Sequence, residues 1–265
     1  MKPIGQLPVA VGRQIRFVLV DIDDTLTLDG RLPAVSLAAM ERLQAAGLHV
    51  VPITGRPAGW CDHIARMWPV DALVGENGAF YFRYDRRHRR MLRRYWKPAE
   101  ERRADRERLD RLARQIPAAV PGCRVAADQA YREADLAIDF CEDVPPLPMD
   151  RVEEIVRLFE AAGAQAKVSS IHVNGWFGDY DKLSMTRILF QEVFEAPLEA
   201  VRERSVFVGD SPNDEPMFAF FPYAAGVRNV LSFVDAMTHR PAFLAARCGG
   251  AGFAEIVDHL LAARG

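Results

Sequence analysis

Two acid-rich stretches carry the residue types most suited to chemistry in this sequence. In FVLVDIDDTLT, Phe17 to Thr27, the acids Asp21, Asp23 and Asp24 directly follow a short apolar run. SVFVGDSPND, residues 205–214, repeats the arrangement with two further acids. Like charges this close repel one another, and aspartate is depleted in strands. Such a cluster at the end of a buried strand indicates that a cation is needed beside it.

The spacing indicates which cation and which substrate. Thr54 follows a second apolar run, LHVVPI, so polar residues stand after three predicted strands. The carboxyl ends of parallel strands form one edge of a sheet, where α/β proteins place their sites. Asp21, Asp23 and Asp210 suit Mg²⁺, which prefers oxygen ligands, and a phosphate would complete the charge balance. The hydroxyl of Thr54 and the ammonium of Lys182 suit that phosphate.

The surrounding pattern predicts the elements that position these residues. Apolar β-branched runs alternate with amphipathic segments: we expect strands at 17–20, 48–54 and 70–75, and helices at 34–46 and from Pro57. After residue 181 the rhythm resumes, with a helix at 182–194, strands at 205–210 and 223–227, and a terminal helix. This is typical of an α/β fold, a Rossmann-like core with a parallel sheet covered on both faces.

An insertion interrupts this rhythm near residue 83. Residues 83–114 contain fourteen basic residues against six acidic ones. Strand-like READLAIDF and AKVSSIHVNGWF follow, with a helical segment between them. We therefore expect a core of residues 1–83 and 180–265 and an α+β module of residues 84–179. The arginine-rich segment is interpreted as a solvated face in preference to a polyanion-binding one.

Four ordered motifs resemble those of the haloacid dehalogenase (HAD) superfamily of phosphatases. They are DIDDT, the threonine after VVPI, DK, and GDSPND. The resemblance implies that Asp21 is the nucleophile that forms an aspartyl-phosphate and that Asp23 is the general acid and base. It also implies that Mg²⁺ is held by Asp21, the Asp23 carbonyl and Asp210, with Asp214 close by.

The position of the insertion is similar to that in the type IIB branch, which carries a C2-type cap after the second motif. That branch includes phosphatases for sugar phosphates. Two features depart from the pattern: Asp24 stands where many members have glycine, and the double glycine of phosphomannomutase relatives is missing after residue 210. The second departure disfavours a mutase without excluding it.

Further residues are candidates for substrate contact. Asn77 lies in an Asn-Gly turn, which is ordinary hairpin chemistry as well as a possible contact. His172, Asn174 and Trp176 lie in SSIHVNGWF, which offers an aromatic platform and polar groups for a sugar, although the tryptophan is equally compatible with hinge packing. With Thr54 and Lys182, the complete substrate-binding set adds Gly55, Arg56 and Asn213.

The composition bears on binding partners and on cellular location. The 265 residues are 49% hydrophobic and 26% charged, with a net charge of −2. This balance favours neither nucleic-acid nor membrane binding. The four cysteines show no metal-ligand spacing, and no signal peptide is evident, so we expect a cytoplasmic protein with reduced thiols.

The sequence thus predicts a Mg²⁺-dependent phosphatase for a small phosphorylated metabolite, with a sugar phosphate favoured. A phosphotransferase or mutase using the same aspartyl-phosphate and a non-catalytic phospho-ligand sensor are the alternatives. The oligomeric state stays open.

Overall fold

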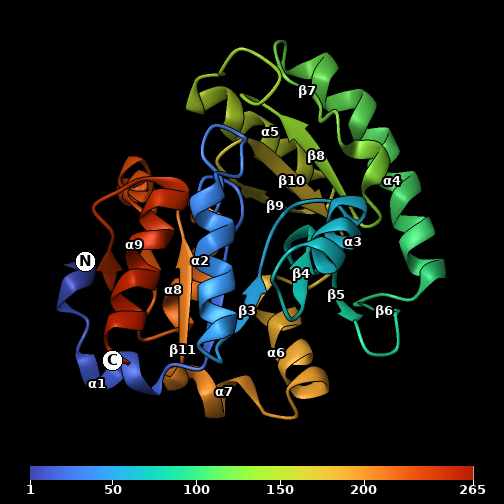
Figure 1. Ribbon diagram of the computed structural model, residues 1–265. Helices are drawn as coiled ribbons and strands as arrows, with labels where there is room; N and C mark the ends of the chain where they lie inside the picture. The colour runs from blue at the N-terminus through green and yellow to red at the C-terminus, as the bar shows by residue number, and fades with distance from the viewer. Residues whose placement is uncertain (265) are drawn as a thin grey trace.

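A six-stranded parallel sheet forms the centre of the molecule (Figure 1). The computed structural model describes residues 1–264. The strand order is β1 (Lys2–Pro3), β13 (Phe243–Leu244), β12 (Ala225–Gly226), β11 (Ser205–Gly209), β2 (Phe17–Val20) and β3 (His49–Pro52). Every neighbouring pair is parallel. The predicted α/β fold with a parallel core sheet is confirmed.

Both faces of this sheet are covered, as the strand β2 shows. Val18 and Val20 pack into one apolar cluster, whereas Phe17 and Leu19 pack into another on the opposite face. Successive side chains of a strand point to opposite faces, so a continuous apolar run is what two covered faces require. The first cluster includes α2 (Ala34–Ala45), α3 (Ala58–Met67) and α9 (Gly249–Ala262), and α1 (Val9–Gln14) contacts α9. The second includes α6 (Lys182–Val193), α7 (Leu198–Val201) and α8 (Glu215–Phe220).

One expected helix face is only partly right. From the sequence, we expect the apolar side of the helix α2 to contain Val35, Leu37, Ala38, Met40, Leu43 and Ala46. Met40 and Leu43 are buried, but Val35 is 43% exposed, and Ala38 and Ala46 are exposed as well. Ser36 is buried in place of Val35, because its hydroxyl donates to the carbonyl of Leu26 at 2.7 Å.

A small antiparallel sheet extends the core beyond β3. It contains β4 (Leu73–Gly75), β5 (Phe80–Asp85) and β6 (Arg90–Tyr95). A parallel bridge between Ile53 and Val74 joins it to the central sheet. The turn between β4 and β5 is the short helix η2 (Glu76–Gly78), in which all three residues have positive φ. The predicted strand–turn–strand at this point is confirmed.

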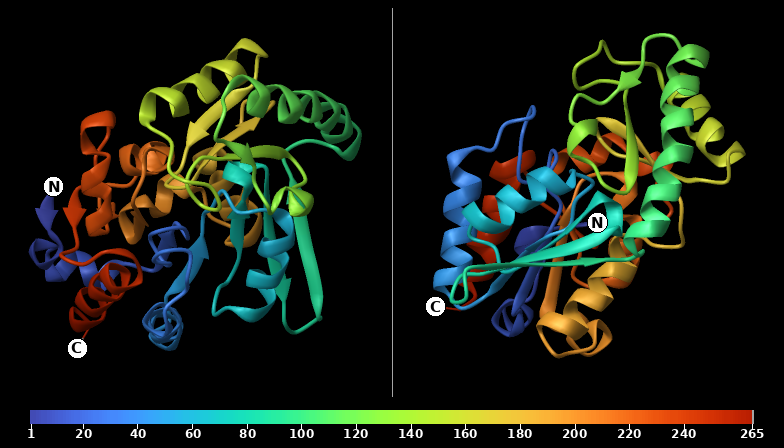
Figure 2. Two further views of the ribbon diagram at one scale, coloured as in Figure 1. Left: turned by 90° about the horizontal axis from the view of Figure 1, so that it is seen from above. Right: turned by 90° about the vertical axis from the view of Figure 1, so that its right-hand side faces the viewer.

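Between β6 and α6 the chain forms a second unit, in which two helices cover one antiparallel sheet and enclose a separate apolar core. The antiparallel sheet β7 (Arg124–Val125), β8 (Asp135–Asp139), β10 (His172–Trp176), β9 (Gln165–Val168) is covered by α4 (Ala99–Ala119) and α5 (Met149–Ala161). It lies at one end of the core sheet (Figure 1, Figure 2). The expected module boundary at residue 83 falls inside β5, which pairs with β4 and β6. We therefore propose that the inserted unit consists of residues 99–176.

The sheet of the inserted unit has one apolar and one polar face. Leu136, Ile138 and Val173 point to α4 and α5 and belong to the apolar cluster there. Their neighbours in sequence, including His172 and Asn174, point to the other face, toward the core. Because successive side chains of a strand point to opposite faces, the polar side chains of this sheet face the edge of the core sheet.

Among the described helices, none combines the length and the apolar character needed to cross a bilayer. The cytoplasmic location stays a prediction.

Candidate active site

Three buried aspartates converge at the carboxyl edge of the central sheet. Asp21 follows β2 and Asp210 follows β11, and these strands pair in parallel, with Val20 opposite Val208. Asp214 lies four residues further on, in η5 (Pro212–Asp214). One carboxylate oxygen from each aspartate lies within 4.8 Å of the others. Three of the four acids predicted at the metal site therefore lie together, whereas the carboxylate of the fourth, Asp23, is bound by Arg56.

Lys182 is the cation that touches this cluster. It is the first residue of α6, and its Nζ lies 2.7 Å from Asp21 Oδ1 and 2.7 Å from Asp214 Oδ1. Burial by itself lowers the pKa of Lys182, but the two carboxylates raise this pKa by more than burial lowers it. The ammonium group of Lys182 therefore stays charged. Burial also raises the pKa of Asp21 to about 8 and that of Asp210 well above its ordinary value. One ammonium does not balance three carboxylates, and this all-oxygen set suits a divalent cation such as Mg²⁺.

Neighbouring groups fix the direction of each carboxylate. Asp210 accepts hydrogen bonds from the Thr25 hydroxyl at 3.0 Å and from Asn229 Nδ2 at 3.1 Å. Asp214 Oδ2 accepts the backbone N–H of Asp210 at 3.1 Å. A Cβ at Gly209 would collide with that same carboxylate, which explains the glycine before Asp210. The second acid-rich stretch is therefore a preorganised loop.

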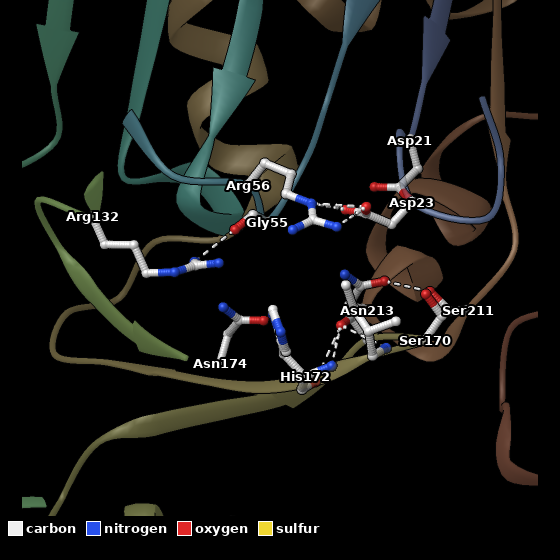
Figure 3. A pocket seen from close by; sticks show the side chains of 12 residues that line it. Asp21, Asp23, Gly55, Arg56, Arg132, Ser170, His172, Asn174, Ser211 and Asn213 are labelled. Atoms are coloured by element: carbon white, nitrogen blue, oxygen red, sulfur yellow. Dashed lines mark hydrogen bonds and ion pairs between the residues drawn. The ribbon is translucent and has the colours of Figure 1, made fainter. Parts of the chain in front are cut away.

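Asp23 faces the inserted unit and is held by Arg56 (Figure 3). Arg56 Nε donates to both carboxylate oxygens of Asp23, at 2.8 and 3.0 Å. The same guanidinium donates to Glu142 of the inserted unit at 2.8 Å. Although Arg56 is buried, its acidic neighbours raise its pKa. Arg56 thus links the predicted general acid to the inserted unit.

The backbone conformation at Asp24 explains why many family members have glycine at this position and why aspartate can replace it. Asp24 has φ 54°, in the left-handed region that glycine occupies freely. Aspartate is among the few other residues that tolerate this region. Its N–H donates to the Thr27 hydroxyl at 2.9 Å, and its carbonyl accepts from Asn229 at 2.7 Å. The position keeps the turn geometry that a glycine would supply.

Core and inserted unit meet over a small cavity of about 10 Å³ (Figure 3). Its lining includes Asp21, Asp23, Gly55, Arg56, Ser211 and Asn213 from the core and Arg132, Ser170, His172 and Asn174 from the inserted unit. This is about the space that one water molecule requires. A phosphate is larger, so we expect the two parts to separate when a substrate enters.

Two buried polar atoms of the inserted unit have no hydrogen-bond partner at this cavity. They are Ser170 Oγ and His172 Nε2. The latter lies 2.8 Å from Glu142 Oε2 but is not aligned for a hydrogen bond. Unpaired buried polar groups are costly, so these atoms are suited to meeting polar atoms of a ligand.

Some of the residues predicted to contact substrate do not line this cavity, among them Thr54, Asn77 and Trp176. Thr54 is buried beside it, and its Oγ1 accepts the N–H of Arg56 at 3.0 Å. The Asn77 amide is buried next to Gly55, without a hydrogen-bond partner. Trp176 is 2% exposed, donates Nε1–H to the Tyr180 carbonyl at 3.1 Å and stacks on the Tyr180 ring. Its position matches the hinge-packing interpretation.

Sequence reasoning missed the contacts that join the two parts. The Glu76 carboxylate accepts N–H bonds from three consecutive residues of the inserted unit, 133–135, and from Ala58 of the core. Arg132 Nη1 donates to the Gly55 carbonyl at 2.8 Å. Arg132 lies among many arginines of this chain, and Glu76 lies in a turn, so neither residue carries a distinguishing signal in the sequence.

Comparisons with known proteins agree with this architecture. Residues 18–102 match the model of the haloacid dehalogenase-like hydrolase family. The chain is similar to this family over those residues, which include Asp21, Asp23 and Thr54. A phosphoglycolate phosphatase of Methanothrix thermoacetophila is 25% identical over 256 residues, covering 94% of this chain and 98% of the relative.

Solved structures share the fold over nearly the whole chain. The Thermoplasma acidophilum protein 0175 has a TM-score of 0.70 at 19% identity, covering 93% of this chain and 98% of that one. A sugar phosphatase of HAD subclass IIB, BT4131, has a TM-score of 0.61 at 15% identity, covering 92% and 98%. The fold of the core and that of the inserted unit are thus both shared with these structures.

Proposed function

We propose that this protein is a Mg²⁺-dependent phosphatase for the monoester of a small metabolite, with a sugar phosphate as the favoured substrate. The observation that carries the proposal is the arrangement around Asp21: a buried carboxylate with Lys182 on one side, Asp210 close by, and Asp23 directed at the inserted unit. Superfamily relatives named as phosphoglycolate and sugar phosphatases support the same reaction class.

In this proposal Asp21, the Asp23 carbonyl and Asp210 would hold Mg²⁺, and Asp214 would retain Lys182 and the loop before it. The closeness of the Asp21 and Asp210 carboxylates supports this set, and the Asp23 carbonyl is added from the family resemblance. When bound, Mg²⁺ supplies the missing positive charge and polarises phosphoryl oxygens.

Asp21 acts as the nucleophile in the first step. Its carboxylate oxygen forms a bond to phosphorus while the bond from phosphorus to the leaving alcohol oxygen breaks. Lys182, already 2.7 Å from Asp21, offsets negative charge on the transferring group. The Thr54 hydroxyl hydrogen is free for a phosphoryl oxygen because its oxygen accepts from Arg56.

Asp23 moves protons in both steps. It donates a proton to the departing alcohol oxygen, and then takes one from the water that attacks the aspartyl-phosphate. This second attack breaks the bond between Asp21 and phosphorus and releases inorganic phosphate. The Arg56 contact with Asp23 must loosen before Asp23 carries a proton, which couples the chemistry to the residue that also holds Glu142.

Phosphate release tests this proposal. The panel contains hexose phosphates, phosphoglycolate and an aryl phosphate, each with Mg²⁺ or with chelator. We expect release that requires Mg²⁺ and falls by about 10⁴-fold or more in Asp21→Asn. Asp258→Asn, which removes an exposed carboxylate on α9, serves as the matched control. Equal release by Asp21→Asn and the wild type would contradict the nucleophile assignment.

A further inference from the structure

A second, much larger cavity opens beside Asp23. It has a volume of about 500 Å³, within the range of small-molecule sites. Its walls are mainly apolar and aromatic, with Trp60 and Ile64 from α3, Trp68 after that helix, and Tyr131 from the inserted unit. Asp23 and Arg56 line it as well. We call this cavity the Trp60 groove.

Two exposed aromatic rings mark the groove as a binding surface. Trp60 is 42% exposed and Tyr131 is 58% exposed, and no other aromatic side chain among residues 1–264 is exposed to this degree. One comes from the core and the other from the inserted unit, so the groove spans the boundary between them. Aromatic side chains left in water at the rim of a cavity indicate a ligand that covers them.

Contacts around the rings keep them in place. The Arg56 guanidinium carbon lies 4.4 Å from the centroid of the Trp60 ring, a cation–π contact. Gly59 leaves room for Tyr131, since a Cβ there would lie 3.0 Å from the Tyr131 Cβ. The aromatic wall is therefore tied to the arginine that holds Asp23.

A different cavity of about 510 Å³ also reaches Asp23, and its chemistry is the opposite. Its lining includes the acids Asp24, Asp29 and Glu142. These carboxylates disfavour an anionic group and offer no aromatic surface. The site itself has about 10 Å³ of space, so the alcohol part of a bound ester must extend away from it. Of the two ways out, the Trp60 groove suits a ligand with a carbon-rich face.

We propose that the Trp60 groove binds the alcohol part of the substrate and that this part carries a ring with an apolar face, stacked on Trp60 or Tyr131. The inference rests on the proposed phosphatase function, in which the leaving oxygen lies at Asp23. Sugar rings and aryl rings share this chemistry, because both present C–H or π surface to an aromatic side chain. His63, which also lines the groove and has an exposed side chain, would favour the sugar by meeting its hydroxyls.

The test compares esters with and without a ring. For the wild type, Trp60→Ala, Tyr131→Ala and Trp60→Phe, kcat/KM is measured on glucose 6-phosphate, phenyl phosphate and phosphoglycolate. We expect the ratio of kcat/KM for each ring ester to that for phosphoglycolate to fall about 3- to 10-fold in the alanine variants, mainly through KM. Trp60→Phe should restore most of the ratio. A larger fall for glucose 6-phosphate than for phenyl phosphate would identify the sugar.

Met67→Ala provides the matched control, because Met67 is 69% exposed on the same helix and does not line the groove. An unchanged ratio in both alanine variants, or an equal loss on all three esters, would overturn the proposal. If the wild type hydrolyses none of the esters, fluorescence separates the two failures. If the ring esters quench tryptophan fluorescence in the wild type but not in Trp60→Phe, the groove binds rings although the phosphatase proposal fails. If the ring esters cause no quenching in the wild type, the groove proposal is rejected as well.

Discussion

The core wall of the site is built from residues that directly follow parallel strands, whereas the opposite wall is built from alternate residues of an antiparallel sheet. On the core wall, Asp21 and Asp210 come from paired strands, and other side chains of the core hold their carboxylates. On the other wall, His172 and Asn174 lie on a strand from which Val173, between them, packs into the apolar cluster of the inserted unit.

This difference separates chemistry from selectivity. Fixed carboxylates and a buried lysine suit a reaction common to all substrates, because their geometry does not depend on the inserted unit. A wall that must move away for entry suits recognition of the alcohol part. The predictions below probe this division, from the largest expected effect to the smallest.

Asp23→Asn tests the core wall. Loss of the proton donor should lower kcat/KM for a sugar phosphate by about 10²- to 10⁴-fold. The loss should be smaller for an aryl phosphate, since a phenolate leaves with less help from an acid. Steady-state kinetics on both esters measures the difference, with Asp29→Asn as a nearby exposed control. Identical losses on the two esters would argue against a general acid.

Glu76→Ala tests the boundary between the walls. The variant leaves three backbone N–H groups of the inserted unit without their acceptor. At about 1 kcal/mol or more for each, unfolding should become easier by about 3 kcal/mol. Thermal unfolding measures the effect, and hydrogen exchange should rise at residues 133–135. Glu133→Gln, which keeps those N–H groups and alters a half-exposed side chain, should leave both readouts near wild type.

Asn174→Ala tests the wall of the inserted unit. Asn174 lines the cavity and donates to Asp135 at 3.0 Å. Its removal should change the ranking of substrates, with about a 10-fold change in the ratio of kcat/KM between two sugar phosphates. Activity on phenyl phosphate should change less. Arg157→Ala on α5, with a side chain 64% exposed, is the control, and a uniform loss on every ester would place Asn174 with the chemistry instead.

Glu142 gives the smallest effect, in acid. Burial by itself raises the pKa of Glu142, but contacts with His172 and Arg56 outweigh this effect. The net result is a pKa lowered from 4.5 to about 2. The ionised group therefore stabilises the closed arrangement above pH 4.5, and this stability is lost as the pH falls toward 2. Between pH 5 and 3, the melting temperature of the wild type should fall slightly more steeply than that of Glu142→Gln. Parallel curves would show that the contact contributes nothing.

Sequence reasoning reached most of the core. The apolar runs at 17–20 and 205–209 are strands, because continuous burial on both faces leaves a clear signal. The acids after them meet because parallel strands end at one edge. Asp24 was recognised as unusual, but its left-handed backbone was not visible from the residue type alone.

The helix faces and the module boundary were harder to predict. Ser36 is buried because a carbonyl ten residues earlier accepts its hydroxyl, and Val35 is exposed as a result. Strand β6 belongs beside β5 although its arginines suggested the inserted module. Pairing partners, rather than composition, decide both cases.

By itself, the sequence determined the α/β core and the cluster of carboxylates, since short-range patterns specify strands and parallel strands bring their ends together. Tertiary structure alone decided which side chains of the inserted unit face that cluster. Glu76, Arg132 and Glu142 act across 50 to 90 residues of chain, and Trp60 and Tyr131 meet from separate units. Contacts of this kind depend on how two separately folded parts are placed against each other, which no local pattern encodes.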